Sequence, residues 1–167
     1  MKQLFTILTF AIFYSNLAYS QVTTQNISSF PITPNGLVDT ISGTGVQITN
    51  VSYIGDVNSI GYFQSGNNTV GIQSGIVMST GHIGSIPSYT VNSEVGTSGS
   101  MNTNGEVDLS IIANAQTFDA SVLEMDFVSS GDSVEIEMVF ASEEYPEYAC
   151  SGFNDVFGFF ITGPNPN

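Results

Sequence analysis

The densest group of oxygen-bearing side chains lies in residues 142–160, which read SEEYPEYACSGFNDVFGFF. Carboxylate and amide groups stand on both sides of a short loop in this stretch. Calcium takes about six to eight oxygen ligands of these kinds, and they commonly converge on a loop. The sequence therefore predicts a cation site, with calcium as the expected ion, although the spaced pattern of an EF-hand is absent. The candidate ligands are Glu143, Glu144, Glu147, Asn154 and Asp155.

The same loop allows two other interpretations. Paired carboxylates perform glycoside hydrolysis, and Tyr145 and Tyr148 could stack on a sugar ring, so a carbohydrate-binding or glycan-cleaving module is the alternative. A purely structural role, in which glutamates bind loop amides, is the third. A nucleophilic site would have to use His82, whose neighbours form no nucleophile elbow. We therefore expect no catalytic residue and no enzymatic activity.

The charge of the chain limits its partners. Fifteen acidic residues and one basic residue give a formal net charge of −14. Nucleic-acid binding needs cations that displace the counterions of phosphates, and binding to an anionic membrane needs them too. The charge therefore argues against both roles. The partners expected of such a chain are metal cations, with a surface glycan or a protein ligand as further possibilities.

The first 20 residues have the features of a secretory signal peptide. Lys2 precedes an apolar run over residues 4–17, and the small-residue exit Ala18-Tyr19-Ser20 follows. An uncleaved membrane anchor is the alternative, but the run is short for spanning a bilayer. We expect cleavage after Ser20 and a secreted, extracellular or cell-surface protein. The mature chain would then contain no Lys or Arg.

Several segments predict the elements that must position the candidate ligands. Residues 21–35 form a polar lead-in or edge segment, and residues 36–167 form one β domain. Residues 46–54 are rich in β-branched side chains and predict a strand. Residues 75–81 predict a short buried strand. Short helices are expected over residues 37–41, with Asn35 as N-cap and Gly43 as the stop, and over residues 107–115.

A hairpin is predicted just before the acidic loop. Residues 123–127 and 134–140 alternate between apolar and acidic side chains, and residues 129–132 form the turn. This register places Asp126 opposite Glu135, and Glu124 opposite Glu137. Like charges in such positions are destabilising, so the acidic face is either wet or occupied by cations.

Residues 156–161 are apolar at every side-chain position, which predicts a central strand covered on both sides. These patterns predict an all-β fold, a two-layer antiparallel β-sandwich of jelly-roll-like form with at most short helices. The chain ends in GPNPN directly after this strand, so the domain is expected to be incomplete at its C-terminal end. Cys150 is the only cysteine, and its disulfide partner is expected in the missing part.

Four stretches carry a resemblance to a known family. They are residues 37–61, 71–81, 119–127 and, above all, 140–163, which reads FASEEYPEYACSGFNDVFGFFITG. In this order they resemble the choice-of-anchor L domain of bacterial secreted and surface proteins. The resemblance implies an exported, surface-attached protein and no established reaction. We therefore expect a non-enzymatic extracellular module, adhesive or structural, with a cation-stabilised acidic loop.

Overall fold

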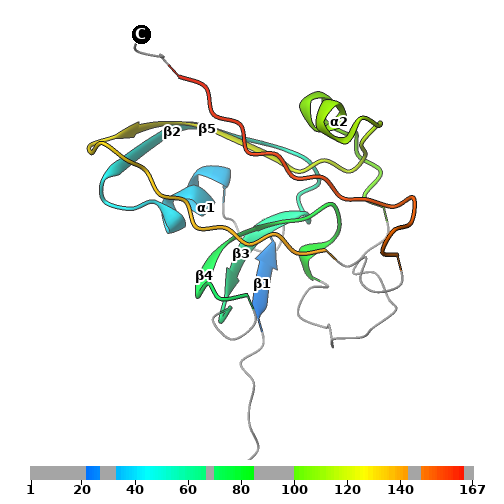
Figure 1. Cartoon of the computed structure of the whole chain (residues 1–167). Coiled ribbons are helices and arrows are strands. Elements are labelled where there is room, and N and C mark those ends of the chain that lie inside the picture. Colours follow the sequence, from blue (N-terminus) through cyan, green and yellow to red (C-terminus); the bar gives the residue numbers. More distant parts are fainter. Residues whose placement is uncertain (1–21, 27–32, 67–69, 85–99, 143–147, 164–167) are drawn as a thin grey trace, which may run out of the picture.

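The structure is a computed structural model that describes residues 22–26, 33–66, 70–84, 100–142 and 148–163. Within these ranges the chain forms strands and two short helices (Figure 1). In chain order they are β1 (Thr23–Asn26), α1 (Pro34–Ile41), β2 (Val46–Ile54), β3 (Ile60–Gln64), β4 (Ser74–Met78), α2 (Val107–Ala113) and β5 (Val122–Ser129).

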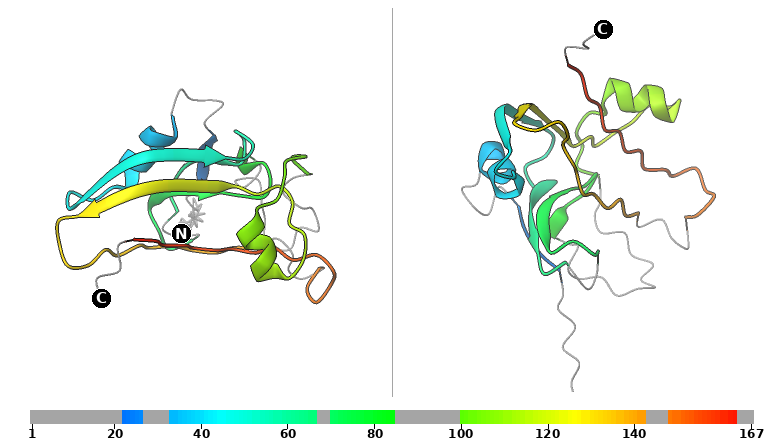
Figure 2. Two further views of the ribbon diagram at one scale, coloured as in Figure 1. Left: turned by 90° about the horizontal axis from the view of Figure 1, so that it is seen from above. Right: turned by 60° about the vertical axis from the view of Figure 1, so that its left-hand side comes forward.

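The strands form two antiparallel sheets. One has the order β1-β3-β4, and the other pairs β2 with β5. Strand β1 lies inside the predicted polar lead-in and forms one edge of its sheet, with β4 at the other edge. Figure 2 shows the long β2–β5 pair facing the extended C-terminal part of the chain across the molecule. The prediction of an all-β fold with antiparallel sheets and only short helices is confirmed.

Helix α1 begins at Pro34, three residues before the predicted start at residue 37. Thr33, not Asn35, is its N-cap, and the Thr33 hydroxyl accepts a hydrogen bond from the Gly36 N–H at 3.2 Å. Pro34 occupies the first turn, where its missing N–H is not needed. The backbone N–H of Ser42 closes the other end on the carbonyl of Val38.

The buried core lies where α1 meets the three-stranded sheet. Helix α1 contacts both β2 and β4. Full burial of a Val, Leu or Ile side chain contributes about 1.5–3 kcal/mol to the stability of the fold. These few residues therefore hold much of the described framework in place. The buried apolar residues among those described are Val22, Leu37, Val38, Ile60, Ile83 and Ala120.

The β2–β5 pair contains a β-bulge. Thr49 pairs with Asp126, but the next registered pair is Ser52 with Glu124, so Asn50 and Val51 together oppose one residue of β5. Asn50 has φ 53°, in the left-handed region. Asparagine tolerates this conformation better than any β-branched residue. The exposure pattern along β2 changes phase at the same point.

The bulge brings hydrogen-bond donors to the acidic face of β5. The Asn50 side-chain amide donates to an Asp126 carboxylate oxygen at 2.6 Å, and the Ser52 hydroxyl donates to Glu124 at 3.3 Å. The predicted hairpin partners of these acids are therefore wrong. Uncharged donors on β2 face Asp126 and Glu124, whereas the predicted hairpin would have placed other carboxylates there.

The turn after β5 also directs the chain away from the predicted hairpin. The Ser130 N–H donates to the Gly45 carbonyl at 2.9 Å, at the start of β2. Residues 133–142 then run extended outside any strand, and so do residues 153–163. We call these segments the Glu run and the Phe run. The prediction of a covered central strand at residues 156–161 is also wrong, because most of these side chains are exposed.

The bulge generates a stability prediction. Replacing Asn50 with Val should lower the free energy of unfolding by about 1–2 kcal/mol, because a β-branched residue is strained at positive φ. Replacing Asn50 with Gly removes the same side-chain amide but tolerates the backbone conformation. Urea denaturation of both variants measures the difference. Equal losses in Asn50→Val and Asn50→Gly would contradict a role for backbone conformation.

Candidate functional site

The predicted cation ligands divide into two groups in the structure. Glu143, Glu144 and Glu147 lie outside the described residues. Asn154 and Asp155 lie at the start of the Phe run, and both are exposed. The structure therefore describes one of the four predicted carboxylates and the single predicted amide.

Asp155 approaches a loop that is distant in sequence. The Thr80 hydroxyl donates to Asp155 Oδ1 at 3.4 Å, which joins the Phe run to the segment that follows β4. Among the described residues this long contact is the only side-chain hydrogen bond of Asp155. Most of the acceptor capacity of its carboxylate is therefore open to a ligand.

The loop that carries Thr80 is firmly held. The Ser79 N–H donates to the Ser59 carbonyl at 2.9 Å, and the buried Ser59 hydroxyl donates to the Gly81 carbonyl at 2.9 Å. Ile83 is fully buried, and its N–H donates to the Asn58 carbonyl at 3.0 Å. Thr80 is thus a fixed point on the core, against which Asp155 is positioned.

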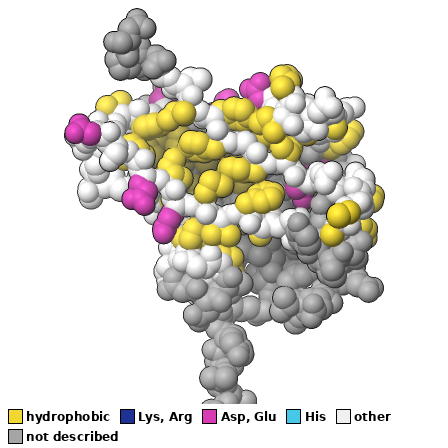
Figure 3. All heavy atoms as spheres, viewed as in Figure 1, with side chains coloured by type: hydrophobic (Ala, Val, Ile, Leu, Met, Phe, Trp, Pro, Cys, Tyr) yellow, Lys and Arg dark blue, Asp and Glu magenta, His cyan; other side chains and the backbone are white. Residues whose placement is uncertain are grey.

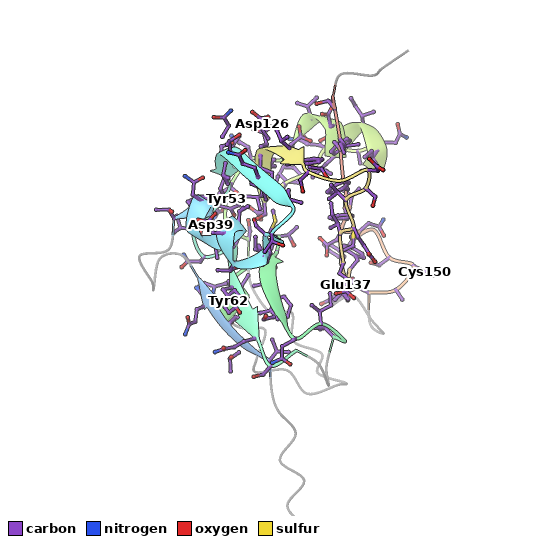
Figure 4. The ribbon with its side chains drawn as sticks, turned by 90° about the vertical axis from the view of Figure 1, so that its left-hand side faces the viewer. Asp39, Tyr53, Tyr62, Asp126, Glu137 and Cys150 are labelled. Carbon is purple, nitrogen blue, oxygen red and sulfur yellow. The ribbon has the colours of Figure 1, made fainter. Side chains whose placement is uncertain are left out.

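The described residues do not form a metal centre by themselves. Within them, no three His, Cys, Asp or Glu side chains gather closely enough to hold a metal ion. His82 Nδ1 accepts a hydrogen bond from the Gly84 N–H at 3.0 Å within its own turn. Figure 4 shows Glu137 and Asp126 on separate segments, and Cys150 at an outer bend of the chain. Cys150 is exposed and carries a free thiol.

The described end of the acidic loop is a closed turn. The Ser151 N–H donates to the Tyr148 carbonyl at 3.0 Å. The rings of Tyr148 and Phe153 meet edge to face, with centroids 5.6 Å apart. This contact occupies part of the Tyr148 ring, which the glycan interpretation assigns to sugar stacking. Tyr145, the other predicted aromatic, lies outside the described residues.

A second carboxylate, that of Asp119, accepts more hydrogen bonds than Asp155 does, and the sequence analysis did not identify it. Asp119 accepts hydrogen bonds from the Ser100 hydroxyl and the Thr103 N–H, both at 2.8 Å. Its own backbone N–H donates to the Thr103 carbonyl at 3.2 Å. Asp119 has φ 52°, a conformation that Asp adopts more readily than most residues. It therefore fastens residues 100–104 to the segment just before β5.

The surroundings of Asp119 change its acidity. Burial alone would raise the pKa of this carboxyl, but the hydrogen bonds from Ser100, Thr103 and the Met101 N–H outweigh it and lower the pKa. The ionised form is therefore the form that the folded chain stabilises. All of these donors are protein groups, so Asp119 acts as a clasp between segments.

Helix α2 lies on an excursion whose two ends meet. Asn104 forms a β-bridge with Phe118, and Gly105 lies so close to the Thr117 backbone that a Cβ would have no room. The Glu106 side chain caps the helix by accepting from the Leu109 N–H at 2.8 Å. Hydrogen bonds from Leu109 and other backbone groups lower the pKa of Glu106.

An open hollow of about 530 Å³ lies beside α2. Its lining combines polar and apolar side chains and contains no aromatic one. It is lined by Asn104, Gly105, Glu106, Val107, Ser110, Ile111, Ala115, Gln116 and Thr117. The hollow therefore lacks the aromatic platform on which a sugar ring usually stacks.

The Asp119 clasp predicts a pH dependence of stability. Because folding lowers the pKa of Asp119, its stabilising contribution is present above the unfolded pKa, about 3.9, and is lost as the pH falls through the folded pKa. Asp119→Asn should therefore unfold more easily than the wild type at pH 7, and the difference should shrink towards pH 3. Urea denaturation across this range tests it.

Asp132→Asn is the matched control, because Asp132 is an exposed carboxylate in the turn after β5. It should change stability little at pH 7. A gap between Asp119→Asn and wild type that stays constant down to pH 3 would contradict an ionic clasp.

Comparison with known proteins identifies the family. The model of the choice-of-anchor L domain matches residues 19–167. No curated protein and no solved structure shows significant similarity to the chain. Among the described residues, no helix is long and apolar enough to cross a membrane. A choice-of-anchor domain indicates an extracellular, surface-associated module of a bacterial protein. With the family model covering nearly all of its length, the chain belongs to the choice-of-anchor L domain family.

Proposed function

We propose that this chain is a non-enzymatic adhesive or structural module of a secreted or surface-anchored protein, and that calcium orders its acidic loop. Residues 1–20 serve as the signal peptide in this proposal. Family membership supports the extracellular location. Calcium is abundant outside cells, and extracellular modules bind it with dissociation constants of about 10⁻⁴–10⁻³ M.

The observation that carries the proposal is the position of Asp155. Asp155 lies where the acidic loop ends, and its exposed carboxylate is next to the Thr80 hydroxyl. The loop that carries Thr80 is held to the core by hydrogen bonds. Two oxygen-bearing groups from distant parts of the sequence therefore meet at the end of a stretch that holds three glutamates. Carboxylate, hydroxyl and carbonyl oxygens suit calcium, and water can complete its coordination.

The local geometry limits which predicted ligands share one ion with Asp155. Asn154 and Asp155 are adjacent on an extended run, so their side chains point to opposite sides. The ion would take Asp155 together with Glu147 and one of Glu143 and Glu144. Asn154 would then contribute its backbone carbonyl or remain outside the site.

Calcium would also relieve the charge of the chain. The fifteen acidic residues repel one another in the compact folded state, and the one basic residue offsets little of this repulsion. A divalent ion among the loop carboxylates removes part of this repulsion and fixes the loop. A surface module gains a rigid contact region in this way, without any catalytic group.

A thermal melt in calcium and in excess chelator tests the proposal. Calcium at 100 times its dissociation constant should add about 2.7 kcal/mol, which raises the midpoint by roughly 5–10 °C for a chain of this size. Asp155→Asn should remove the shift. Asp132→Asn removes the same charge from the turn after β5 and should keep the shift. Sodium chloride at equal ionic strength should not reproduce it.

If 10 mM calcium leaves the midpoint unchanged, the proposed site does not exist at extracellular concentrations. A glycan role predicts a different outcome. Binding to a glycan array, or release of sugar, that Glu143→Gln or Glu144→Gln abolishes would favour the alternative module over the calcium-ordered one.

A further inference from the structure

The Glu run, residues 133–142, has an unpaired backbone. Among the described residues, its groups from residue 133 to residue 141 make no backbone hydrogen bond, although the chain is extended there. Every side chain in this part of the run is exposed. An extended segment with free N–H and C=O groups is a template on which another strand can pair.

The side chains of the Glu run alternate between two faces. In an extended chain Val134, Ile136, Met138 and Phe140 share one face, and Glu135, Glu137 and Val139 share the other. The apolar face continues onto the Phe run, because the rings of Phe140 and Phe157 lie 6.1 Å apart. Phe159, Phe160 and Ile161 of that run are 57%, 55% and 65% exposed. Figure 3 shows hydrophobic side chains across this side of the molecule, with acidic groups near its borders.

An added strand would face both patterns at once. Directly opposite residues of two paired strands lie on the same face and interact. Apolar residues opposite Ile136 and Met138, and cations opposite Glu135 and Glu137, would therefore complement the run best. We propose that the Glu run binds, by β-strand addition, a separate polypeptide in which Lys or Arg alternates with β-branched apolar residues.

Charge disfavours one arrangement in which a second copy could be this partner. The 167 residues contain a single basic residue, Lys2, so no segment within them supplies two cations on one face. Antiparallel pairing of two Glu runs centred on Ile136 would place Glu135 of one copy opposite Glu137 of the other. This juxtaposition of like charges is destabilising, whereas a basic strand would pair favourably with both glutamates.

Synthetic peptides test the proposal directly. The Lys peptide TVKVKVTVT and the Glu peptide TVEVEVTVT differ only at two positions on one face, where one has Lys and the other has Glu. Fluorescence anisotropy of each labelled peptide with the purified chain, in excess chelator, measures binding independently of the calcium proposal. We expect the Lys peptide to bind more tightly by on the order of tenfold or more, because two cross-strand pairs change from repulsive to attractive.

Matched variants assign the binding to the Glu run. Glu135→Lys combined with Glu137→Lys should reverse the preference, so that the Glu peptide binds more tightly. Glu124→Gln with Asp126→Asn removes two carboxylates, two residues apart, from a strand already paired with β2. It should leave the preference unchanged. Met138→Pro removes a backbone donor at an exposed position and should weaken binding of the Lys peptide.

Each result decides the proposal. Equal binding of the two peptides would overturn it, and so would a preference abolished by the Glu124 and Asp126 substitutions, which would indicate non-specific charge attraction. Unchanged binding in both Met138→Pro and Val139→Pro would exclude strand addition, because the N–H groups of successive residues point to opposite edges of an extended chain. Sedimentation velocity of the chain without peptide should give a monomer, with or without residues 1–20. A dimer broken by Ile136→Glu would assign the Glu run to a second copy instead.

Discussion

The pairing of β2 with β5 is the interaction on which the described fold depends. The sequence offers one basic residue against fifteen acidic ones, so the acids of β5 cannot be balanced by cations of the chain. The bulge at Asn50 solves this by placing an amide and a hydroxyl opposite two carboxylates. Since a charged acceptor strengthens a hydrogen bond, neutral donors take the role that Lys and Arg have in most proteins.

Local patterns predicted the elements well, and long-range pairing poorly. Residues 46–54 form β2 as predicted, and the predicted helix over residues 107–115 is observed as α2. These features depend on side chains a few residues apart. The hairpin prediction was wrong because a strand has two edges and nearness in sequence does not choose between them. The Asn50 and Ser52 donors on β2 lie more than 70 residues in sequence from the β5 carboxylates that they bind.

The candidate site was predictable in composition but not in geometry. The concentration of acids around residues 143–155 is visible in the sequence, whereas Thr80, the partner of Asp155, lies 75 residues away. Asp119 escaped prediction because a single Asp in a polar stretch carries no periodic signal, and its positive φ appears only in the fold. Residues 143–152 connect the Glu run to the Phe run, so an ion that orders this loop would also set how the two runs face a partner.

The excursion that carries α2 has a consequence for how the family can vary. Its ends are joined by the Asn104–Phe118 bridge and by the close approach of Gly105 to Thr117. The residues between them therefore begin and end at one place on the framework. Closing a longer loop there costs only a few tenths of a kcal/mol for modest additions. Evolution can consequently lengthen, shorten or exchange this segment as a cassette, and diversify the surface without altering the pairing of any strand.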